Sequence, residues 1–260
     1  MTRTIRIKKG ADIRLKGRPS TQVEQASSAP LYAVQPPNYQ GIVPKLEVKE
    51  GAAVKAGSPL FHSKENPAVK FLSPVSGTVK QVLRGEKRRI LAVVVEADGK
   101  NEQQAYAPID PASTDREALV AAVAERGFFA FLEQRPFATA ANPTDVPRSI
   151  HVSGFDSAPL AADMEVVLDG RAEAFQTGIH ALRVLAGGSN VQLGTKVGQS
   201  FYSSIDGVVT YTFDGPHPTG NAGVQIHHTR PINKGEVVWT MHAEDVANLG
   251  ETLSSGTYCA

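Results

Sequence analysis

The segment AERGFFAFLEQRPF, residues 124–137, carries side chains of the types that bind flat apolar molecules. Aromatic rings supply apolar surface for a planar ligand, and a guanidinium donates hydrogen bonds to a carbonyl oxygen. The segment therefore suggests an apolar slot with Arg135 as the donor at its rim. Core packing is the commoner role for any single phenylalanine, so the sequence leaves both roles open. The aromatic residues concerned are Phe128, Phe129, Phe131 and Phe137.

A second stretch, GPHPTGNAGVQIHHTRPIN at residues 215–233, contains three histidines. They are His217, His227 and His228. Adjacent histidines on a strand would point to opposite faces, and no carboxylate lies beside them at ligand spacing. A metal site is therefore the less favoured interpretation. The prolines instead predict a loop at the carboxyl end of a strand, where open α/β sheets place their ligands.

Residues 46–65 and 73–79 resemble the two halves of a biotinyl/lipoyl-type β-sandwich. A carrier domain of that type needs a lysine at the tip of its hairpin, because only an exposed amine can form the amide to biotin or lipoate. Here the tip falls on Asn66, followed by a proline, and neither Lys64 nor Lys70 lies at the turn. The sequence therefore predicts the scaffold without the prosthetic arm, serving as a rigid docking or spacing module.

Composition excludes several classes of protein. The chain has 260 residues, with 27 Lys and Arg against 26 Asp and Glu, so it lacks the excess positive charge of most nucleic-acid binders. One cysteine, Cys259, cannot form an internal disulfide or build a cysteine-ligated iron–sulfur or zinc site. The longest aliphatic run, residues 90–95, is far shorter than the roughly 20 residues that span a bilayer. We expect a reduced, cytoplasmic protein with no membrane span of its own.

The distribution of turn residues and apolar segments along the chain predicts two domains. From Ile5 to Glu96, short apolar segments alternate with turns rich in glycine and proline, which is typical of an all-β unit. Residues 97–112 are polar and read as a connection, so we place the boundary near Lys100. The predicted domains are residues 1–100 and 101–260.

The second domain shows strand and helix patterns in alternation, which implies a parallel sheet covered by helices. Its first helix lies within residues 113–128, with Ser113 or Thr114 as the N-cap and Gly127 as the stop. Further helices are predicted at 170–188 and 243–253, and strands at 148–156, 190–195, 207–213 and 235–241.

This second arrangement resembles the flavin-binding subunit of respiratory complex I. In that subunit the stretch equivalent to residues 124–137 is a glycine-rich loop whose bare backbone closes over the phosphate of FMN. Phe128, Phe129 and Ala130 stand where glycine or alanine would be expected, and bulky side chains would block that close approach. We therefore expect no tight FMN site.

Five stretches together point to one family. They are IKKGADIRLKGRP, VKEGAAVKAGSPLFHSKENPAVKFLSPVSGTV, RGEKRRILAVVVE, RPF and GPHPTG…IHHTRPIN…VVW. In this order they strongly resemble the A subunits of the Na+-translocating NADH:quinone oxidoreductases, over nearly the whole chain. A related electron-transport family with a similar N-terminal scaffold keeps cysteine clusters and a glycine-rich flavin loop, and this chain has neither.

The resemblance implies a mixed β and α/β fold, in which a barrel-sandwich hybrid precedes a Rossmann-like domain. Members of the family continue into a β-grasp domain and a helical region, so we expect that the chain is a shortened form. The resemblance also implies a location at the cytoplasmic face of the bacterial inner membrane, bound to partner subunits. NADH, FAD, FMN and an iron centre would act in those partners, and electron flow to ubiquinone or menaquinone would export Na+. This chain would carry no cofactor, metal or catalytic residue, and would belong to an enzyme only within the complex.

Two stretches match the positions to which the family's quinone contacts are attributed. The first, YAVQPPNYQGIVP, contributes Pro36, Pro37, Asn38 and Tyr39. The second contributes Phe128, Phe129, Phe131, Arg135, Pro136 and Phe137, of which the last three match best. The alternative is an assembly scaffold with no ligand site, in which the two prolines only stiffen a connection between strands. An efflux-pump adaptor would need a long helical hairpin, for which residues 65–69 leave no room.

Overall fold

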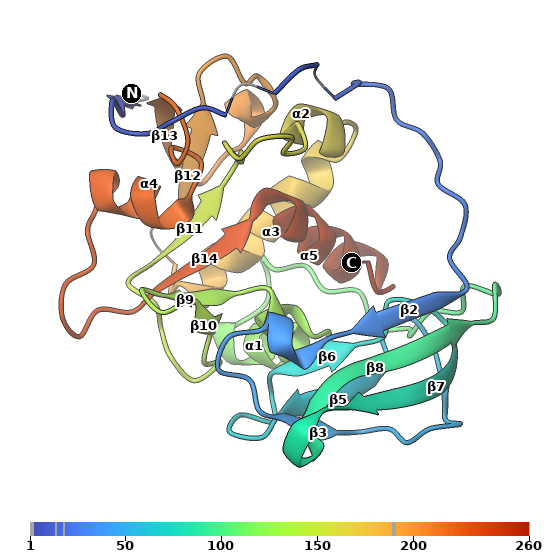
Figure 1. The fold of residues 1–260 in the computed structure, drawn as a ribbon. Helices are drawn as coiled ribbons and strands as arrows, with labels where there is room; N and C mark the ends of the chain where they lie inside the picture. Colours follow the sequence, from blue (N-terminus) through green and yellow to red (C-terminus); the bar gives the residue numbers. More distant parts are fainter. Residues whose placement is uncertain (1–2, 14, 18, 189–190, 260) are drawn as a thin grey trace.

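A computed structural model of the chain describes residues 3–13, 15–17, 19–188 and 191–259. The described chain forms a β-sandwich and an α/β unit, which lie side by side in Figure 1. The expected order of a barrel-sandwich hybrid followed by an α/β domain is confirmed. Within the described residues, none of the helices has the length and apolar character needed to cross a bilayer.

The β-sandwich consists, in the described part of the chain, of a four-stranded and a three-stranded antiparallel sheet. Alternate side chains of the long strands are buried, as expected where one face of a sheet covers a core. The larger sheet has the order β2 (Leu31–Val34), β8 (Ile90–Ala97), β7 (Gly77–Arg84) and β4 (Ala53–Val54). The smaller has the order β3 (Pro44–Leu46), β5 (Pro59–Ser63) and β6 (Lys70–Leu72).

The α/β unit is built on one large sheet, for which the described residues provide seven strands. Its order is β1 (Arg3–Arg6), β13 (Val209–Asp214), β12 (Val191–Lys196), β11 (Ser149–Ser153), β14 (Val238–His242), β9 (Glu133–Arg135) and β10 (Thr139–Ala140). The first five strands are parallel, and β9 and β10 add an antiparallel edge. β11 is buried along its whole length, because helices cover the centre of a parallel sheet.

The helices fall mostly where the sequence predicts them. They are α1 (Arg116–Glu125), α2 (Met164–Val167), α3 (Ala172–Leu185), α4 (Ala222–Thr229) and α5 (Ala243–Ser255), with short 3-10 turns η1 (Pro36–Asn38), η2 (Glu86–Arg88), η3 (Phe128–Ala130) and η4 (Phe201–Ser204). The N-cap of α1 is Asp115, one residue beyond the predicted positions, and its carboxylate accepts a hydrogen bond from Ala118 N at 2.9 Å.

Helices α3 and α5 pack against each other over the large sheet (Figure 1). Glycine permits this close approach at two points. A Cβ on Gly178 would lie 2.0 Å from the carbonyl oxygen of Val246, and one on Gly250 would lie 1.8 Å from that of Ala174. Since no side chain fits either gap, these glycines set the separation of the two helices.

Two further differences from the sequence expectations concern strands. Strand β1 pairs in parallel with β13 at the edge of the large sheet, although the all-β unit was expected to begin at Ile5. Its partner lies more than 200 residues away, and strand propensity carries no information about so distant a partner. The other difference concerns His227 and His228, because the assumption that they lie on a strand is wrong: they end helix α4.

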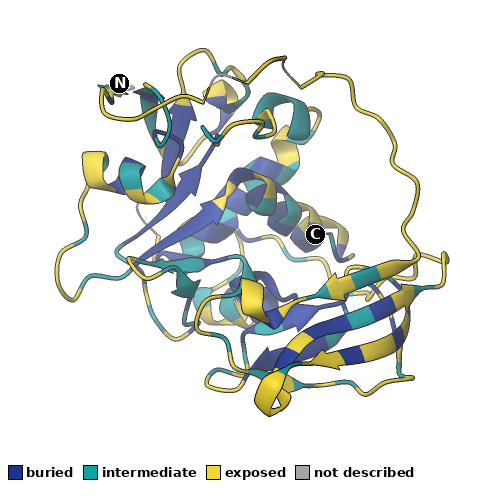
Figure 2. Cartoon of the chain, in the orientation of Figure 1, coloured by how far each residue is buried: buried dark blue, intermediate teal, exposed yellow. Residues whose placement is uncertain are grey.

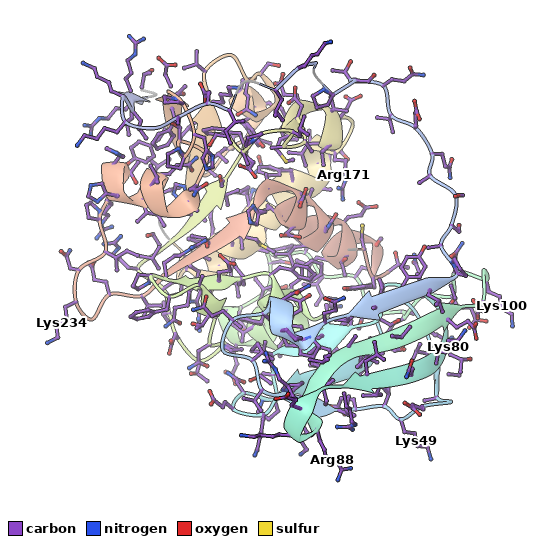
Figure 3. The ribbon with its side chains drawn as sticks, in the orientation of Figure 1. Lys49, Lys80, Arg88, Lys100, Arg171 and Lys234 are labelled. Carbon is purple, nitrogen blue, oxygen red and sulfur yellow. The ribbon has the colours of Figure 1, made fainter. Side chains whose placement is uncertain are left out.

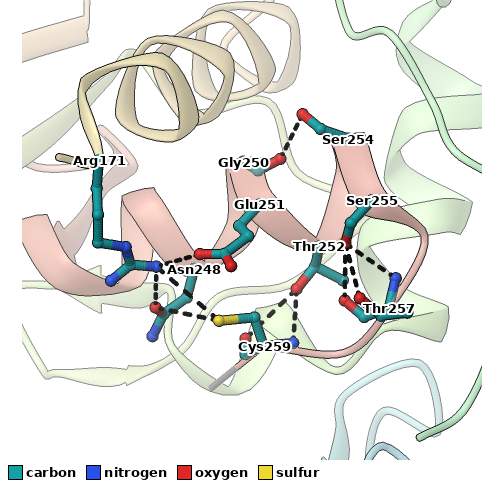
Figure 4. Close-up of polar contacts among 9 residues, drawn as sticks. All are labelled: Arg171, Asn248, Gly250, Glu251, Thr252, Ser254, Ser255, Thr257 and Cys259. Carbon is teal, nitrogen blue, oxygen red and sulfur yellow. Dashed lines mark hydrogen bonds and ion pairs between the residues drawn. The ribbon is translucent and has the colours of Figure 1, made fainter.

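Hydrogen bonds hold the end of the described chain against α5 (Figure 4). The backbone N–H of Cys259 donates to Thr252 Oγ1 at 2.9 Å. Beside it, Arg171 Nη2 binds Glu251 and Asn248 at 2.7 and 2.8 Å. These contacts hold Tyr258 in the core, where it is 8% exposed.

The sandwich and the α/β unit share one hydrophobic core. Buried side chains from both form a single cluster, which includes Phe61 and Phe71 from the sandwich and Phe129 and Trp239 from the large sheet side. Figure 2 shows buried residues throughout both units. The two units are therefore joined by packing as well as by the connecting chain.

Candidate functional site

The crevice of the large sheet lies between β11 and β14. After β11 the chain builds β12 and β13 on one side of it, and then crosses to add β14 on the other. In open α/β sheets, ligands bind at such a reversal, outside the carboxyl ends of the strands. Those ends are Ser153 and His242, which pair with each other in the sheet.

A cavity of about 190 Å³ opens at this point. Ser153 at the end of β11 and Ala222 at the start of α4 line part of it. Most of its walls come from three other parts of the chain: η1 with the residue after it, the segment from η3 through β9, and the junction of β14 and α5. The polar and aromatic residues that they contribute are Asn38, Tyr39, Phe131, Glu133, Arg135, Thr240, His242 and Asp245. The sandwich therefore supplies one wall of a crevice in the α/β unit.

Arg135 is held in place by two neighbours. Its Nε donates to Thr240 Oγ1 at 3.0 Å, and its Nη2 forms an ion pair with Glu133 at 2.5 Å. The antiparallel register of β9 and β14 brings these residues together, since Glu133 lies opposite Thr240. Because the arginine side chain is 23% exposed, its guanidinium is fixed at the wall of the cavity and still reaches solvent.

Asp245 is the most perturbed acid of this cavity. Burial, and next the charges of Glu244 and Glu133, together raise its pKa to about 7. The N-terminus of α5 would favour the ionised form, but the loss of solvent outweighs that effect. A large fraction of the Asp245 side chains is therefore protonated at neutral pH and can donate a hydrogen bond. Burial, and next the charge of Asp245, also raises the pKa of Tyr39.

Arg135 also borders two neighbouring depressions. One, of about 370 Å³, lies against the loop after β11 and the start of α4. The other, of about 230 Å³, is a groove in which four apolar side chains lie beside Gly223 and His227. The apolar residues are Pro136, Ile226, Pro231 and Ile232. Arg135 thus borders the cavity and both depressions.

Comparison with known proteins identifies the family. A family model described as "NqrA N-terminal barrel-sandwich hybrid domain" matches residues 5–98. A second, described as "NqrA second alpha/beta domain", matches residues 114–258. The chain belongs to the NqrA family.

Several curated relatives carry the name of the A subunit of the Na(+)-translocating NADH-quinone reductase. The protein of Pseudomonas aeruginosa PAO1 is 36% identical over 256 residues, which is 97% of this chain and 57% of the relative. The protein of Vibrio vulnificus YJ016 is 35% identical over 257 residues, with the same two shares. That of Yersinia pseudotuberculosis is 33% identical over 258 residues, or 98% of this chain and 58% of the relative. This NqrA-family chain therefore spans less than two thirds of these relatives.

The structure brings together only some of the residues that the sequence singled out. Asn38, Tyr39, Phe131 and Arg135 line the cavity at the crevice, although they come from two distant stretches. Pro136 lies beside them in the neighbouring groove of about 230 Å³. The stretch predicted as a loop, residues 215–233, does follow β13, but helix α4 interrupts it and borders the two depressions.

The remaining candidates lie elsewhere. Phe128 and Phe129 have no exposed surface: the first packs near Phe131 and Tyr258, and the second meets Trp239 edge to face at 5.9 Å. Core packing is therefore what the structure shows for this pair. Pro36, the first residue of η1, is buried, Pro37 is exposed, and Phe137 is 72% exposed. These three line none of the cavities described above.

Sequence reasoning missed Glu133, Thr240, His242 and Asp245. Three of them lie where β14 passes into α5, and the carboxyl end of a parallel strand is a usual place for ligand contacts. This general rule could have drawn attention to the segment MHAED, residues 241–245. Which strand ends face each other, however, depends on the strand order.

The three histidines do not come together as a ligand set. His227 and His228 are exposed at the end of α4, with ring centres 5.2 Å apart. His217 lies in the loop after β13, where its Nδ1 is 3.0 Å from Ser157 Oγ. Among the residues that the structure describes, no group of three His, Cys, Asp or Glu could hold a metal ion.

The hairpin tip of the sandwich faces the α/β unit. The side-chain amide of Asn66 donates to Asn142 Oδ1 at 2.9 Å, while its own oxygen accepts from Ala68 N at 3.2 Å. Nearby, Leu72 fills the space beside Gly127, where a Cβ would come within 2.7 Å of it. A carrier lysine would have to extend freely from this tip. Asn66 instead forms a hydrogen bond that links the two units.

Proposed function

We propose that this chain acts as the A subunit of a Na+-translocating NADH:quinone reductase, a membrane pump that oxidises NADH, reduces ubiquinone or menaquinone and exports Na+. Membership of the NqrA family and the names of its relatives support this assignment. The chain contributes to quinone binding and to assembly of the complex. It binds its partner subunits at the cytoplasmic face of the membrane and carries no redox centre, because the flavins and the iron centre belong to those partners.

The observation that carries the quinone role is the cavity at the carboxyl ends of β11 and β14. Tyr39 and Phe131 offer aromatic walls to a flat ring, and Arg135 offers a fixed hydrogen-bond donor. A quinone presents two carbonyl oxygens, which accept hydrogen bonds. The groove on the other side of Arg135 offers the side chains of Ile226 and Ile232 and two prolines to the isoprenoid tail of ubiquinone or menaquinone.

Two side chains would polarise the bound ring. The guanidinium of Arg135 is oriented by Thr240 and Glu133, so it can donate to one carbonyl without a large entropy cost. Asp245 lines the same cavity and holds its proton near neutral pH. A protonated carboxyl can donate to a carbonyl oxygen, and an ionised one would repel it.

A photoreactive quinone analogue provides the direct experiment on the assembled complex. We expect cross-links to peptides that contain residues 38–39, 131–135 and 240–245, which line the cavity. An excess of unlabelled quinone should suppress them, and peptides that contain the exposed Phe137 alone serve as the background. Cross-links confined to other subunits would refute the quinone role of this chain.

The second candidate function is an assembly scaffold with no ligand site. The full burial of Phe128 and Phe129 favours it, because these two side chains serve packing. The variant Arg135→Ala separates the candidates. Weaker quinone binding in a complex whose subunits still associate normally supports the quinone role, whereas unchanged quinone affinity with weaker association supports the scaffold.

A further inference from the structure

The hairpin of β7 and β8 ends in a strongly basic tip. Residues 84–89, RGEKRR, contain four basic residues and one acid. Figure 2 shows this turn as exposed, and Figure 3 shows Arg88 pointing away from the protein at the edge of the sandwich. The tip is therefore free to meet another surface.

The backbone of the tip is ordered by its own contacts. Gly85 N donates to Arg89 O at 2.8 Å, and Arg84 Nη1 donates to Arg88 O at 3.2 Å. Lys87 and Arg88 have φ values of 52° and 61°, in the left-handed region that few non-glycine residues adopt. The basic side chains of the turn therefore extend from a backbone of defined conformation.

The positive charge of the tip is not compensated. Within the described residues, none of its four cations forms an ion pair, although arginines elsewhere, such as Arg148 and Arg171, pair with glutamates. The nearby Glu50 is engaged, because its carboxylate accepts from Val82 N at 2.8 Å. A fixed turn with unpaired cations produces a local positive potential that attracts anions.

Two exposed leucines stand directly behind the cations. Leu83 on β7 is 39% exposed, and Leu91 on β8 is 41% exposed. Apolar side chains beside lysine and arginine are typical of segments that lie in the headgroup region of a bilayer. No aromatic residue occurs between residues 80 and 94, so the tip lacks the stacking surface that single-stranded nucleic acid requires.

Charge is also segregated along the chain. Residues 30–100 contain 11 Lys and Arg against 6 Asp and Glu, a formal charge of +5. Residues 101–260 contain 9 against 18, a formal charge of −9, and residues 1–29 contain 7 against 2, a formal charge of +5. The overall charge of +1 conceals this separation. An anionic surface would therefore attract both the sandwich and the basic N-terminal segment at the β1 edge, and would repel residues 101–260. The sandwich can thus approach such a surface with its tip, and the basic residues of the N-terminal segment serve as the comparison.

We propose that the β7–β8 tip docks on an anionic lipid bilayer, with Lys87, Arg88 and Arg89 on the phosphate headgroups and Leu83 and Leu91 in the interface. This contact is independent of the quinone site. It attaches the chain directly to the membrane surface, in addition to any attachment through a partner subunit. Salt weakens the contact, because ions screen charges that lie at a solvated surface.

Sedimentation with lipid vesicles measures the contact on the whole chain. We expect binding to vesicles of phosphatidylcholine mixed with phosphatidylglycerol at low salt, and loss of binding to pure phosphatidylcholine. Each basic residue near such a surface raises the partition coefficient about fivefold, so Lys87→Gln, Arg88→Gln and Arg89→Gln together should lower it roughly 100-fold. Leu83→Ser alone should lower it about fivefold.

The matched control is Lys8→Gln, Lys9→Gln and Lys234→Gln, which removes the same charge from exposed positions of the α/β side. Figure 3 shows Lys234 far from Arg88. We expect this control to retain most of the vesicle binding. The proposal is overturned if the unmodified chain does not bind the mixed vesicles, if both triple variants lose equal affinity, or if the tip governs binding to single-stranded RNA and not to vesicles. Circular dichroism verifies that every variant is folded.

Discussion

Replacing Asp245 by asparagine should stabilise the protein at neutral and higher pH. The folded-state pKa of this carboxyl is raised to about 7 from its ordinary 3.8, mainly because the side chain is buried. A shift of this size corresponds to about 4 kcal/mol of folding free energy. Water in the cavity screens part of it, so we expect a gain of roughly 2–4 kcal/mol for Asp245→Asn at pH 8.

The sign of the pH dependence follows from the direction of the shift. Below the unfolded pKa, both states carry the proton and the carboxyl costs no stability. As the pH rises toward the folded pKa of about 7, the unfolded state releases its proton first, so the native protein loses stability. Above that pH the loss is complete. The asparagine of the variant is not ionisable, so the difference between the two proteins should grow between about pH 4 and 7 and then stay constant.

Urea unfolding at several pH values between 4 and 8 provides the measurement. Glu173→Gln is the matched control, because Glu173 lies in the first turn of α3 as Asp245 does in α5, but it is exposed and is not one of the charges that raise the pKa of Asp245. We expect the control to change the free energy of unfolding by much less than Asp245→Asn. An equal stability difference between Asp245→Asn and the unmodified protein at pH 4 and pH 8 would show that the carboxyl is not protonated in the cavity, and would remove its role as a donor.

Three further predictions concern packing and ligands. Gly250→Ala should destabilise the protein by about 1–3 kcal/mol in urea unfolding, because the added Cβ would lie 1.8 Å from a carbonyl oxygen of α3; the control Gly223→Ala meets nothing within 4 Å and should be neutral or stabilising. Asn66→Ala should cost about 1 kcal/mol by removing the contact with Asn142, and an unchanged unfolding midpoint would contradict this role. FMN added to the purified chain should keep its fluorescence, since Phe128 occupies a place where a phosphate-binding loop needs bare backbone; quenching would refute that expectation.

The sequence predicts elements well where hydrophobic periodicity is strong. Helix α3 and strands β11, β12 and β14 fall within their predicted ranges or extend them by one residue, because each has a continuous buried face. The α4 segment escaped prediction because its two buried side chains, Gln225 and Ile226, give too weak a period over eight residues. Gln225 is buried because it hydrogen-bonds His151 of β11 at 2.7 Å, a contact that no local pattern reveals.

The candidate site was predictable only in part, for a physical reason. Tyr39 and Arg135 belong to stretches with distinctive residue patterns, so the sequence alone identifies them as candidates. Asp245 follows an ordinary strand, and its altered pKa arises from burial and from the charge of Glu133, which reaches it only through the pairing of β9 with β14. Desolvation is a property of the assembled cavity, so it cannot be read from spacing along the chain.

Both positions at which these scaffolds resemble cofactor proteins lie at the junction of the two units. Asn66, at the tip where a carrier would present lysine, binds Asn142 across the junction. Gly127 begins the turn where a flavin protein would cradle phosphate, and Leu72 of the sandwich occupies the space beside it. An extended arm or a bound phosphate would each require this junction to open. Packing of the two units therefore fills the space at both positions, whereas the cavity beside Arg135 is open while the two units stay in contact.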